Sequence, residues 1–189
     1  MKLSKEEVEL FYKLYHSLLL YVNEKFDIVK GINSPRDFKR CPIEEINNIR
    51  DRLYEHPALI NSFVIENPLN LSSDELKIIS NWKNFVKGSF LIFRYLKDYT
   101  IFLSPDEPPK AYGVLALTST FKEMLGPYLP IMVEAVLLPF NDKIVYDSIL
   151  IPYPVTFGSG IRRSFNEAYQ KAKSRFGIIT SLPFSSEKR

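Results

Sequence analysis

The sequence is poor in the residues that build metal and disulfide sites. It holds one cysteine, Cys41, and two histidines, His16 and His56, among 189 residues. One cysteine excludes an internal disulfide framework and a zinc site made of several cysteines. Neither histidine has a second cysteine or histidine at the spacing of a metal site. We therefore expect no metal and no cofactor, and the sequence names no catalytic residue.

Long apolar runs are also missing. The longest ones cover residues 17–22 and 135–140, far short of the roughly 20 residues that cross a bilayer. The sequence starts MKLSKEEVEL, which is charged at once and has no apolar segment typical of a signal peptide. We therefore expect a cytoplasmic protein without a membrane partner, and the single cysteine fits a reducing compartment.

A strong excess of one charge is absent as well. The net charge is +3, from 25 basic and 22 acidic residues. A protein dedicated to nucleic acid usually has a concentrated basic face, so we do not expect nucleic acid as a partner. The hydrophobic fraction of 46% and the charged fraction of 25% are typical of a globular protein.

The apolar pattern predicts an α+β fold. Helical spacing dominates residues 1–86, and near Lys87 the period changes from about 3.6 to 2. We expect an N-terminal helical group, a five-stranded antiparallel meander that can curl into a partial barrel, and a C-terminal helix. Residues 1–86 and 87–189 then form either two lobes or one packed domain. The predicted strands cover residues 89–96, 99–104, 111–118, 132–138 and 143–149, the last helix covers residues 161–175, and residues 177–183 can add a short edge strand.

Two predictions concern the packing. If Asn141 and Asp142 form a two-residue turn, one face of the hairpin carries Val133, Ala135, Leu137, Ile144, Tyr146 and Leu150, which should be the core of the sheet. Trp82 lies on the apolar side of a helix just before the first strand. We expect it to link the helical part to the sheet, with a hydrogen-bond partner for its indole N–H.

Several stretches resemble a group of bacterial proteins that often carry a C-terminal SEC-C metal-binding motif. The similar stretches are YVNEKF, NWKNFVKGSFLIFRYLKDYTIFL, YGVLALT, LPIMVEAVLLPFNDKIVYDSIL and FGSGIRRSFNEAYQKAK. The resemblance covers most of the chain and implies a bacterial cytosolic protein. The cysteine-rich tail of the motif is absent from this sequence, so the resemblance implies no metal site here.

The first candidate site is an anion-binding loop before the last helix. Gly158, Ser159 and Gly160 lead into a first turn that holds Arg162 and Arg163. Free backbone N–H groups at a helix start favour an anion, and arginines add bidentate donors. The alternative is a tight turn into a surface helix, with an arginine paired to a carboxylate of the sheet.

The second candidate is a pair of carboxylates, Glu134 and Asp147. In a regular hairpin Val136 lies opposite Asp147, which places Glu134 roughly 7 Å away on the same face. Two acids on one face can share a proton or hold a divalent metal. The alternative is a solvated face on which these acids pair with Lys143, Arg94 or Arg163.

The sequence supports three functional hypotheses. We favour a cytosolic, non-enzymatic module that binds a protein or a small anion. A second hypothesis is a hydrolase-like enzyme for a phosphorylated small molecule, built on Arg162, Arg163, Asp147 and Glu134. A third is single-stranded nucleic-acid binding, in which aromatic side chains stack on bases beside cations. Its residues would be Arg94, Tyr95, Lys97 and Tyr99.

Overall fold

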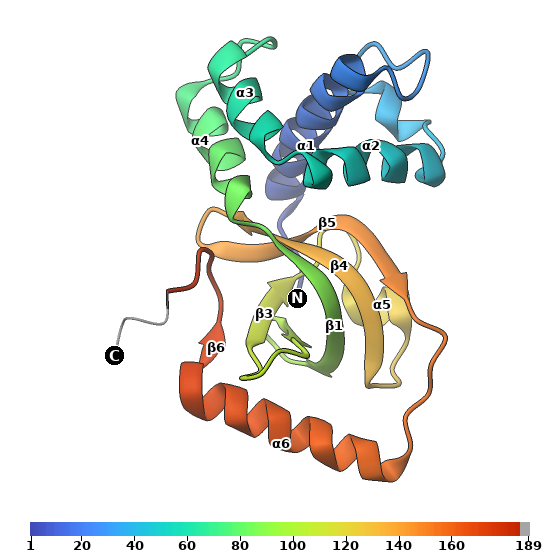
Figure 1. The fold of residues 1–189 in the computed structure, drawn as a ribbon, viewed down its shortest axis with the longest axis vertical. Helices are drawn as coiled ribbons and strands as arrows, with labels where there is room; N and C mark the ends of the chain where they lie inside the picture. The colour runs from blue at the N-terminus through green and yellow to red at the C-terminus, as the bar shows by residue number, and fades with distance from the viewer. Residues whose placement is uncertain (186–189) are drawn as a thin grey trace. The chain divides into compact units, whose positions relative to one another are not determined.

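The computed structural model describes residues 1–185 and divides into two compact units (Figure 1). The helical unit is Lys5–Lys83. The sheet unit consists of Met1–Ser4 and the chain from Asn84 onwards. Met1–Ser4 joins it through a parallel bridge between Lys2 and Ala116.

The helical unit is organised around its longest helix, α1, which contacts three of the others. A capping box at Ser72, whose side chain accepts from the backbone N–H of Glu75, starts the last helix. Asn67 ends the preceding helix in the left-handed conformation, at a φ of 42°. The elements are α1 (Lys5–Phe26), the 3₁₀ turn η1 (Asp37–Lys39), α2 (Ile43–Glu55), α3 (Ala58–Glu66) and α4 (Ser73–Asn81).

Trp82 belongs to the aromatic core of the helical unit. It opens the 3₁₀ turn η2 (Trp82–Asn84), and its ring centroid lies 5.9 Å from those of both Phe11 and Tyr15. The prediction that its indole N–H has a hydrogen-bond partner is wrong, because the buried Nε1 atom has no acceptor within residues 1–185. Its ring neighbours are aromatic and offer no strong acceptor. Its predicted role as a link between the two parts stays a prediction.

The sheet unit contains a six-stranded mixed sheet with the order β2-β1-β4-β5-β3-β6. β2 pairs with β3 as well as with β1, so the sheet is strongly curved. Two pairings, β3 with β5 and β3 with β6, are parallel. The elements are β1 (Val86–Tyr95), β2 (Thr100–Leu103), β3 (Ala111–Leu115), α5 (Phe121–Leu125), β4 (Ile131–Phe140), β5 (Lys143–Pro152), α6 (Ser159–Phe176) and β6 (Ile178–Ile179).

The α+β class is confirmed, but the five-stranded antiparallel meander is wrong. A meander places each strand beside the next one along the chain, whereas here β4 pairs with β1 and β5 pairs with β3. The segment between β3 and β4, which includes α5, is long enough to carry the chain past its sequence neighbour. Alternation of apolar residues marks strands but does not say which strands pair.

The inner face of the curved sheet holds the predicted core. Pairing of Leu137 with Tyr146 and of Ala135 with Leu150 places the predicted residues on one face. All of them are buried except Leu150, which is half-buried. Aromatic rings fill the remaining space in a chain of contacts with centroids 5.0–6.0 Å apart, and the rings are those of Phe90, Phe102, Tyr112, Phe121 and Tyr146.

The outer face of β1, β2 and β3 packs against α6 (Figure 1). Leu91, Ile101 and Leu103 from the strands meet Tyr169 and Ala172 from the helix. These helical residues, with Phe165 and Ala168, recur at the spacing of one helix face. The other face of α6 is exposed. The helix therefore presents one side to the core of the unit and the other to solvent.

Candidate functional site

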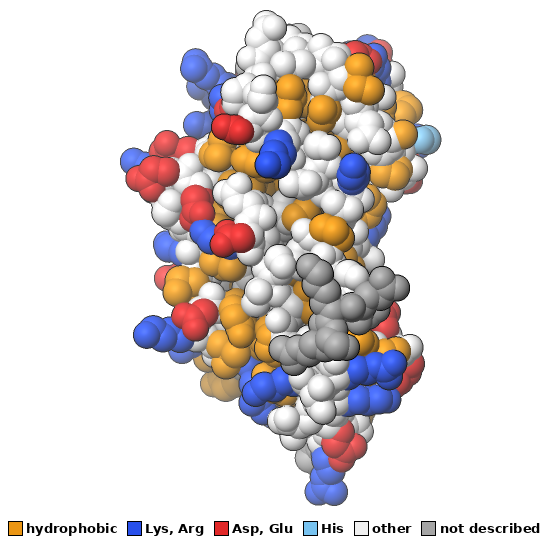
Figure 2. Space-filling view, turned by 90° about the vertical axis from the view of Figure 1, so that its left-hand side faces the viewer, with side chains coloured by type: hydrophobic (Ala, Val, Ile, Leu, Met, Phe, Trp, Pro, Cys, Tyr) orange, Lys and Arg blue, Asp and Glu red, His pale blue; other side chains and the backbone are white. Residues whose placement is uncertain are grey.

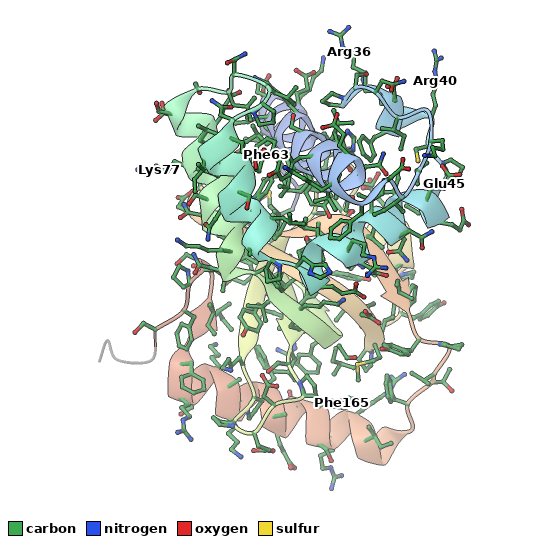
Figure 3. All side chains as sticks on the ribbon, turned by 45° about the horizontal axis from the view of Figure 1, so that its top comes forward. Arg36, Arg40, Glu45, Phe63, Lys77 and Phe165 are labelled. Carbon is green, nitrogen blue, oxygen red and sulfur yellow. The ribbon has the colours of Figure 1, made fainter. Side chains whose placement is uncertain are left out.

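A cavity of about 330 Å³ lies between the outer face of the sheet and the first half of α6. Its floor is a row of side chains across three strands, because Leu91 of β1 pairs with both Leu103 of β2 and Met132 of β4. The helix contributes Ser164, Phe165 and Ala168, and Figure 3 shows Phe165 pointing from α6 towards the sheet. The remaining wall is the loop after β2, through Ser104, Pro105, Asp106, Glu107 and Pro109.

The loop after β2 is closed by paired hydrogen bonds at its base. The backbone N–H of Ser104 donates to the carbonyl of Lys110 at 2.9 Å, and the N–H of Lys110 donates to the Ser104 hydroxyl at 3.0 Å. Asp106 pairs with Lys110 at 3.5 Å, and Glu107 accepts from Lys171 of α6 at 2.9 Å. Both pairs are exposed, so each contributes about 1 kcal/mol or less. The loop is thus held at its base, while its acids stay open to exchange of partners.

The chemistry of the cavity wall is apolar and acidic. Its only charged lining side chains among the described residues are Asp106 and Glu107. Among the described residues, no histidine lines it. Its serines, Ser104 and Ser164, thus have no imidazole beside them within the described lining of the sheet unit. The cavity is suited to binding an apolar group beside a positive charge.

The sequence did not predict this site. The one sequence feature that could have indicated it is the loop of prolines and acids at residues 105–110, which is also typical of an ordinary connection between strands. The floor residues read as core, because Leu91, Leu103 and Met132 continue the apolar pattern of their strands. Only the folded chain brings the loop, the row of side chains and α6 together.

The structure places the five residues of the predicted anion loop at the start of α6. Gly158 is the N-cap, with extended φ and ψ of −70° and 169°, and the helix begins at Ser159 and Gly160. Arg162 donates from Nε to the carbonyl of Phe157 at 3.3 Å. Within residues 1–185, neither Arg162 nor Arg163 pairs with a carboxylate, so the alternative of an arginine bound to the sheet is wrong. Anion binding at this loop stays a prediction.

A bulge interrupts the ladder on which the carboxylate pair depended. The register is regular from Phe140–Lys143 to Leu137–Tyr146, but the next pair is Ala135–Leu150. Three residues of β5, Asp147 to Ile149, therefore lie opposite Val136 alone, and Ser148 has a φ of 79°. The predicted regular register is wrong beyond Tyr146, because sequence alternation does not reveal an inserted residue.

The two carboxylates differ in their surroundings as a result. Asp147 is fully buried and accepts from the backbone N–H of Ile149 at 3.4 Å inside the bulge. Glu134 is half-buried between Ser89 and Ile151 on the outer face. Neither residue lines the cavity, and within the described part of the chain no three His, Cys, Asp or Glu side chains cluster as metal ligands would.

The residues of the nucleic-acid hypothesis are also dispersed. Tyr95 donates its hydroxyl to the carbonyl of Gly126 at 2.9 Å. The ring of Tyr99 lies flat over Gly113, where an added Cβ atom would come within 2.8 Å of it. Arg94 instead reaches α6 and donates to Asn166 at 3.0 Å. Because both tyrosines are used in packing, this group does not form the stacking surface that the hypothesis requires.

Comparisons with known proteins add no family. No family model matches the chain, no curated protein matches it, and no solved structure matches it. The resemblance to SEC-C-containing bacterial proteins therefore stays a prediction. Among residues 1–185, no helix combines the length and the apolar character that crossing a membrane requires.

Proposed function

We propose that the chain is a non-enzymatic binding module whose sheet unit takes up an apolar group that carries a positive charge. The observation that supports this most is the lining of the cavity, in which an apolar floor meets Asp106 and Glu107 and, among residues 1–185, no lining residue is basic. The volume of about 330 Å³ lies at the lower end of the range for ligand pockets. The ligand is therefore compact, such as one ring or a short aliphatic chain with an ammonium group.

Two parts of the cavity would bind two parts of the ligand: the apolar floor would bind its apolar body, and the acids of the loop after β2 would bind its ammonium group. The apolar body would cover Leu91, Leu103 and Met132, where each Å² removed from water contributes about 25 cal/mol. The ammonium would replace Lys110 or Lys171 beside an acid. These surface pairs are weak, so the exchange costs little. The same chemistry is offered by a small amine and by a lysine side chain next to an apolar residue of a peptide.

Three ligands of similar shape and different charge test the proposal. Titration of the full chain with 2-phenylethylamine, 2-phenylethanol and 3-phenylpropanoate, followed by NMR, should give the tightest binding for the amine and the weakest for the carboxylate. We expect about a tenfold difference between amine and alcohol, which corresponds to about 1.4 kcal/mol. Equal affinities, or a preference for the carboxylate, would contradict the proposal.

Variants connect the preference to the cavity. The double change Asp106→Asn and Glu107→Gln should make the amine and the alcohol bind equally, and Ala168→Leu should weaken all three ligands by filling the space. The matched control, Asp98→Asn with Asp142→Asn, removes the same charge from two hairpin turns and should change nothing. A short peptide with a Leu-Lys pair distinguishes the source, because binding of this peptide without binding of the amine indicates a protein partner.

A further inference from the structure

The exposed face of α6 carries a row of polar and basic side chains. With 100° between successive residues of a helix, five residues fall within one sector of about 100°, directly beside the face that packs on the sheet. All of them are exposed. We call this set the α6 stripe, and it consists of Arg162, Arg163, Asn166, Gln170 and Lys173.

The α6 stripe has one neighbouring acid, Glu167, which lies one turn after Arg163 and forms no ion pair with it within residues 1–185. The helix contains five basic residues and one acid, although the whole chain has a net charge of only +3. Within residues 1–185, no carboxylate pairs with Arg162, Arg163 or Lys173. Lys171 has a carboxylate partner, but it lies on another side of the helix, towards Glu107. The side view in Figure 2 shows exposed basic side chains in its lower part, together with acidic ones.

A β-bulge adds a further cation to the α6 stripe. The register of β1 with β2 shifts between Ile92 and Arg94, so Phe93 and Arg94 both face the helix. The guanidinium of Arg94 lies 4.9 Å from the ring centroid of Phe93 and 5.0 Å from that of Tyr169. It also donates to Asn166 at 3.0 Å. Arg94 is thus held in place beside the stripe without a carboxylate partner.

The composition of the α6 stripe discriminates between polyanions. A helix that lies on a membrane needs a free apolar face, whereas the apolar face of α6 packs against the sheet. The stripe itself holds arginine, asparagine, glutamine and lysine. These side chains contact phosphates and the base edges of the major groove, arginine to guanine and asparagine or glutamine to adenine. The groove of B-form DNA admits an α-helix, and the deep, narrow groove of RNA duplexes does not.

We propose that the α6 stripe, together with Arg94, binds double-stranded DNA by lying along its major groove. Arg162 and Lys173 are eleven residues apart, which places them about 16 Å apart along the helix axis. Arg94 meets the helix between them, at Asn166 and Tyr169. Four cations, Arg94, Arg162, Arg163 and Lys173, are therefore arranged along one side of the helix for contact with phosphates.

Salt dependence measures this contact directly. Fluorescence anisotropy of a labelled 20-base-pair duplex with the full chain should show log Kobs falling against log salt with a slope of about −3 to −4, since each neutralised phosphate contributes about −0.9. Arg162→Ala, Arg163→Ala and Lys173→Ala should each make the slope shallower by about 0.9. These side chains are exposed, so the variants should keep the melting temperature of the wild type.

Controls distinguish the stripe from general attraction. Arg36→Ala with Arg40→Ala removes two exposed arginines of the helical unit, which point away from its helices in Figure 3, and should leave the slope unchanged. An equal loss in this control, or no duplex binding at 50 mM salt, would overturn the proposal. Tighter binding of the single strand or of an RNA duplex would overturn the major-groove geometry. Competition by poly-glutamate as effective as that by DNA would indicate an acidic protein instead.

Discussion

The two units use their polar side chains in different ways. In the helical unit, Asp37 accepts from Asn33 and Ser34, and these hydrogen bonds lower the pKa of its carboxyl. In the sheet unit, the side chains of Glu134 and Lys173 form no hydrogen bond or ion pair within residues 1–185. Asp37 thus stabilises a turn of the helical unit, whereas Glu134 and Lys173 of the sheet unit are available to a ligand. This difference is why both proposals concern the sheet unit.

In the helical unit, His16 and the single cysteine, Cys41, also serve the packing of the fold. His16 stacks on Phe38 with centroids 5.1 Å apart, and burial lowers the pKa of its imidazole to about 4. Burial, followed by the nearby Glu45, raises the pKa of the Cys41 thiol to about 11. At neutral pH the imidazole is uncharged and the thiol is protonated, so Cys41 is a poor nucleophile. Both residues act as packing groups of the helical unit.

The largest expected effect is on the core of the sheet unit. Leu137 is fully buried on the inner face, opposite Tyr146. Leu137→Ala should lower the free energy of unfolding by about 2–5 kcal/mol, because it removes buried methyl groups and leaves a cavity. Urea denaturation measures this loss. Ile65→Ala, at a side chain that is 83% exposed, serves as control and should change stability by less than about 0.5 kcal/mol. Equal effects would show that the inner face is assigned wrongly.

The sequence predicted the elements of the sheet unit better than their arrangement. The alternation of apolar residues located β1, β4 and β5, because a strand with a buried face repeats every two residues. It did not reveal the bulges at Phe93 and Ser148, because extra residues in one strand shift the pairing without changing the composition. These bulges turn Arg94 to α6 and interrupt the ladder beside Asp147. The position of Arg94 beside the α6 stripe therefore depends on a local irregularity that a pattern of alternation does not contain.

The sequence pattern also did not predict which side chain packs against Gly113. Gly113 has no side chain because the ring of Tyr99 occupies that space, with the nearest ring atom 2.8 Å from where a Cβ would lie. Glycine in a strand often marks such a close approach, but the pattern does not name the partner. The net charge also gives no information on where the charges lie. It averages the basic α6 with acids that lie elsewhere in the chain, so it hides the stripe.

A smaller effect is expected from His16 as pH falls. The pKa of about 4 in the folded state is below the value of about 6.5 in the unfolded chain, so the unfolded state binds the proton first. The stabilisation is complete above pH 6.5 and is lost as pH falls from 6.5 towards 4. The slope is at most about 1.4 kcal/mol per pH unit, because a single group differs by at most one bound proton between the two states.

Denaturation at pH 7, 6 and 5 measures this slope, and His16→Gln should flatten it. The carboxyls whose pKa is lowered, such as Asp37 and Glu75, change stability from about pH 5 downwards, so the step from pH 7 to 6 reports on His16 most directly. An unchanged slope in the variant would show that another group titrates in this range.

The smallest effects come from a matched pair of carboxylates that tests the comparison itself. Asp37→Ala removes the acceptor of hydrogen bonds from Asn33 and Ser34, which close the turn before η1. Glu134→Ala removes a carboxylate that forms no hydrogen bond or ion pair within residues 1–185. Thermal unfolding should therefore show a lower melting temperature for Asp37→Ala and an unchanged melting temperature for Glu134→Ala. Asp37→Asn should restore part of the loss, since an amide oxygen still accepts. If Glu134→Ala destabilises as much as Asp37→Ala, the carboxylates of the sheet unit also hold the fold, and the contrast between the two units does not stand.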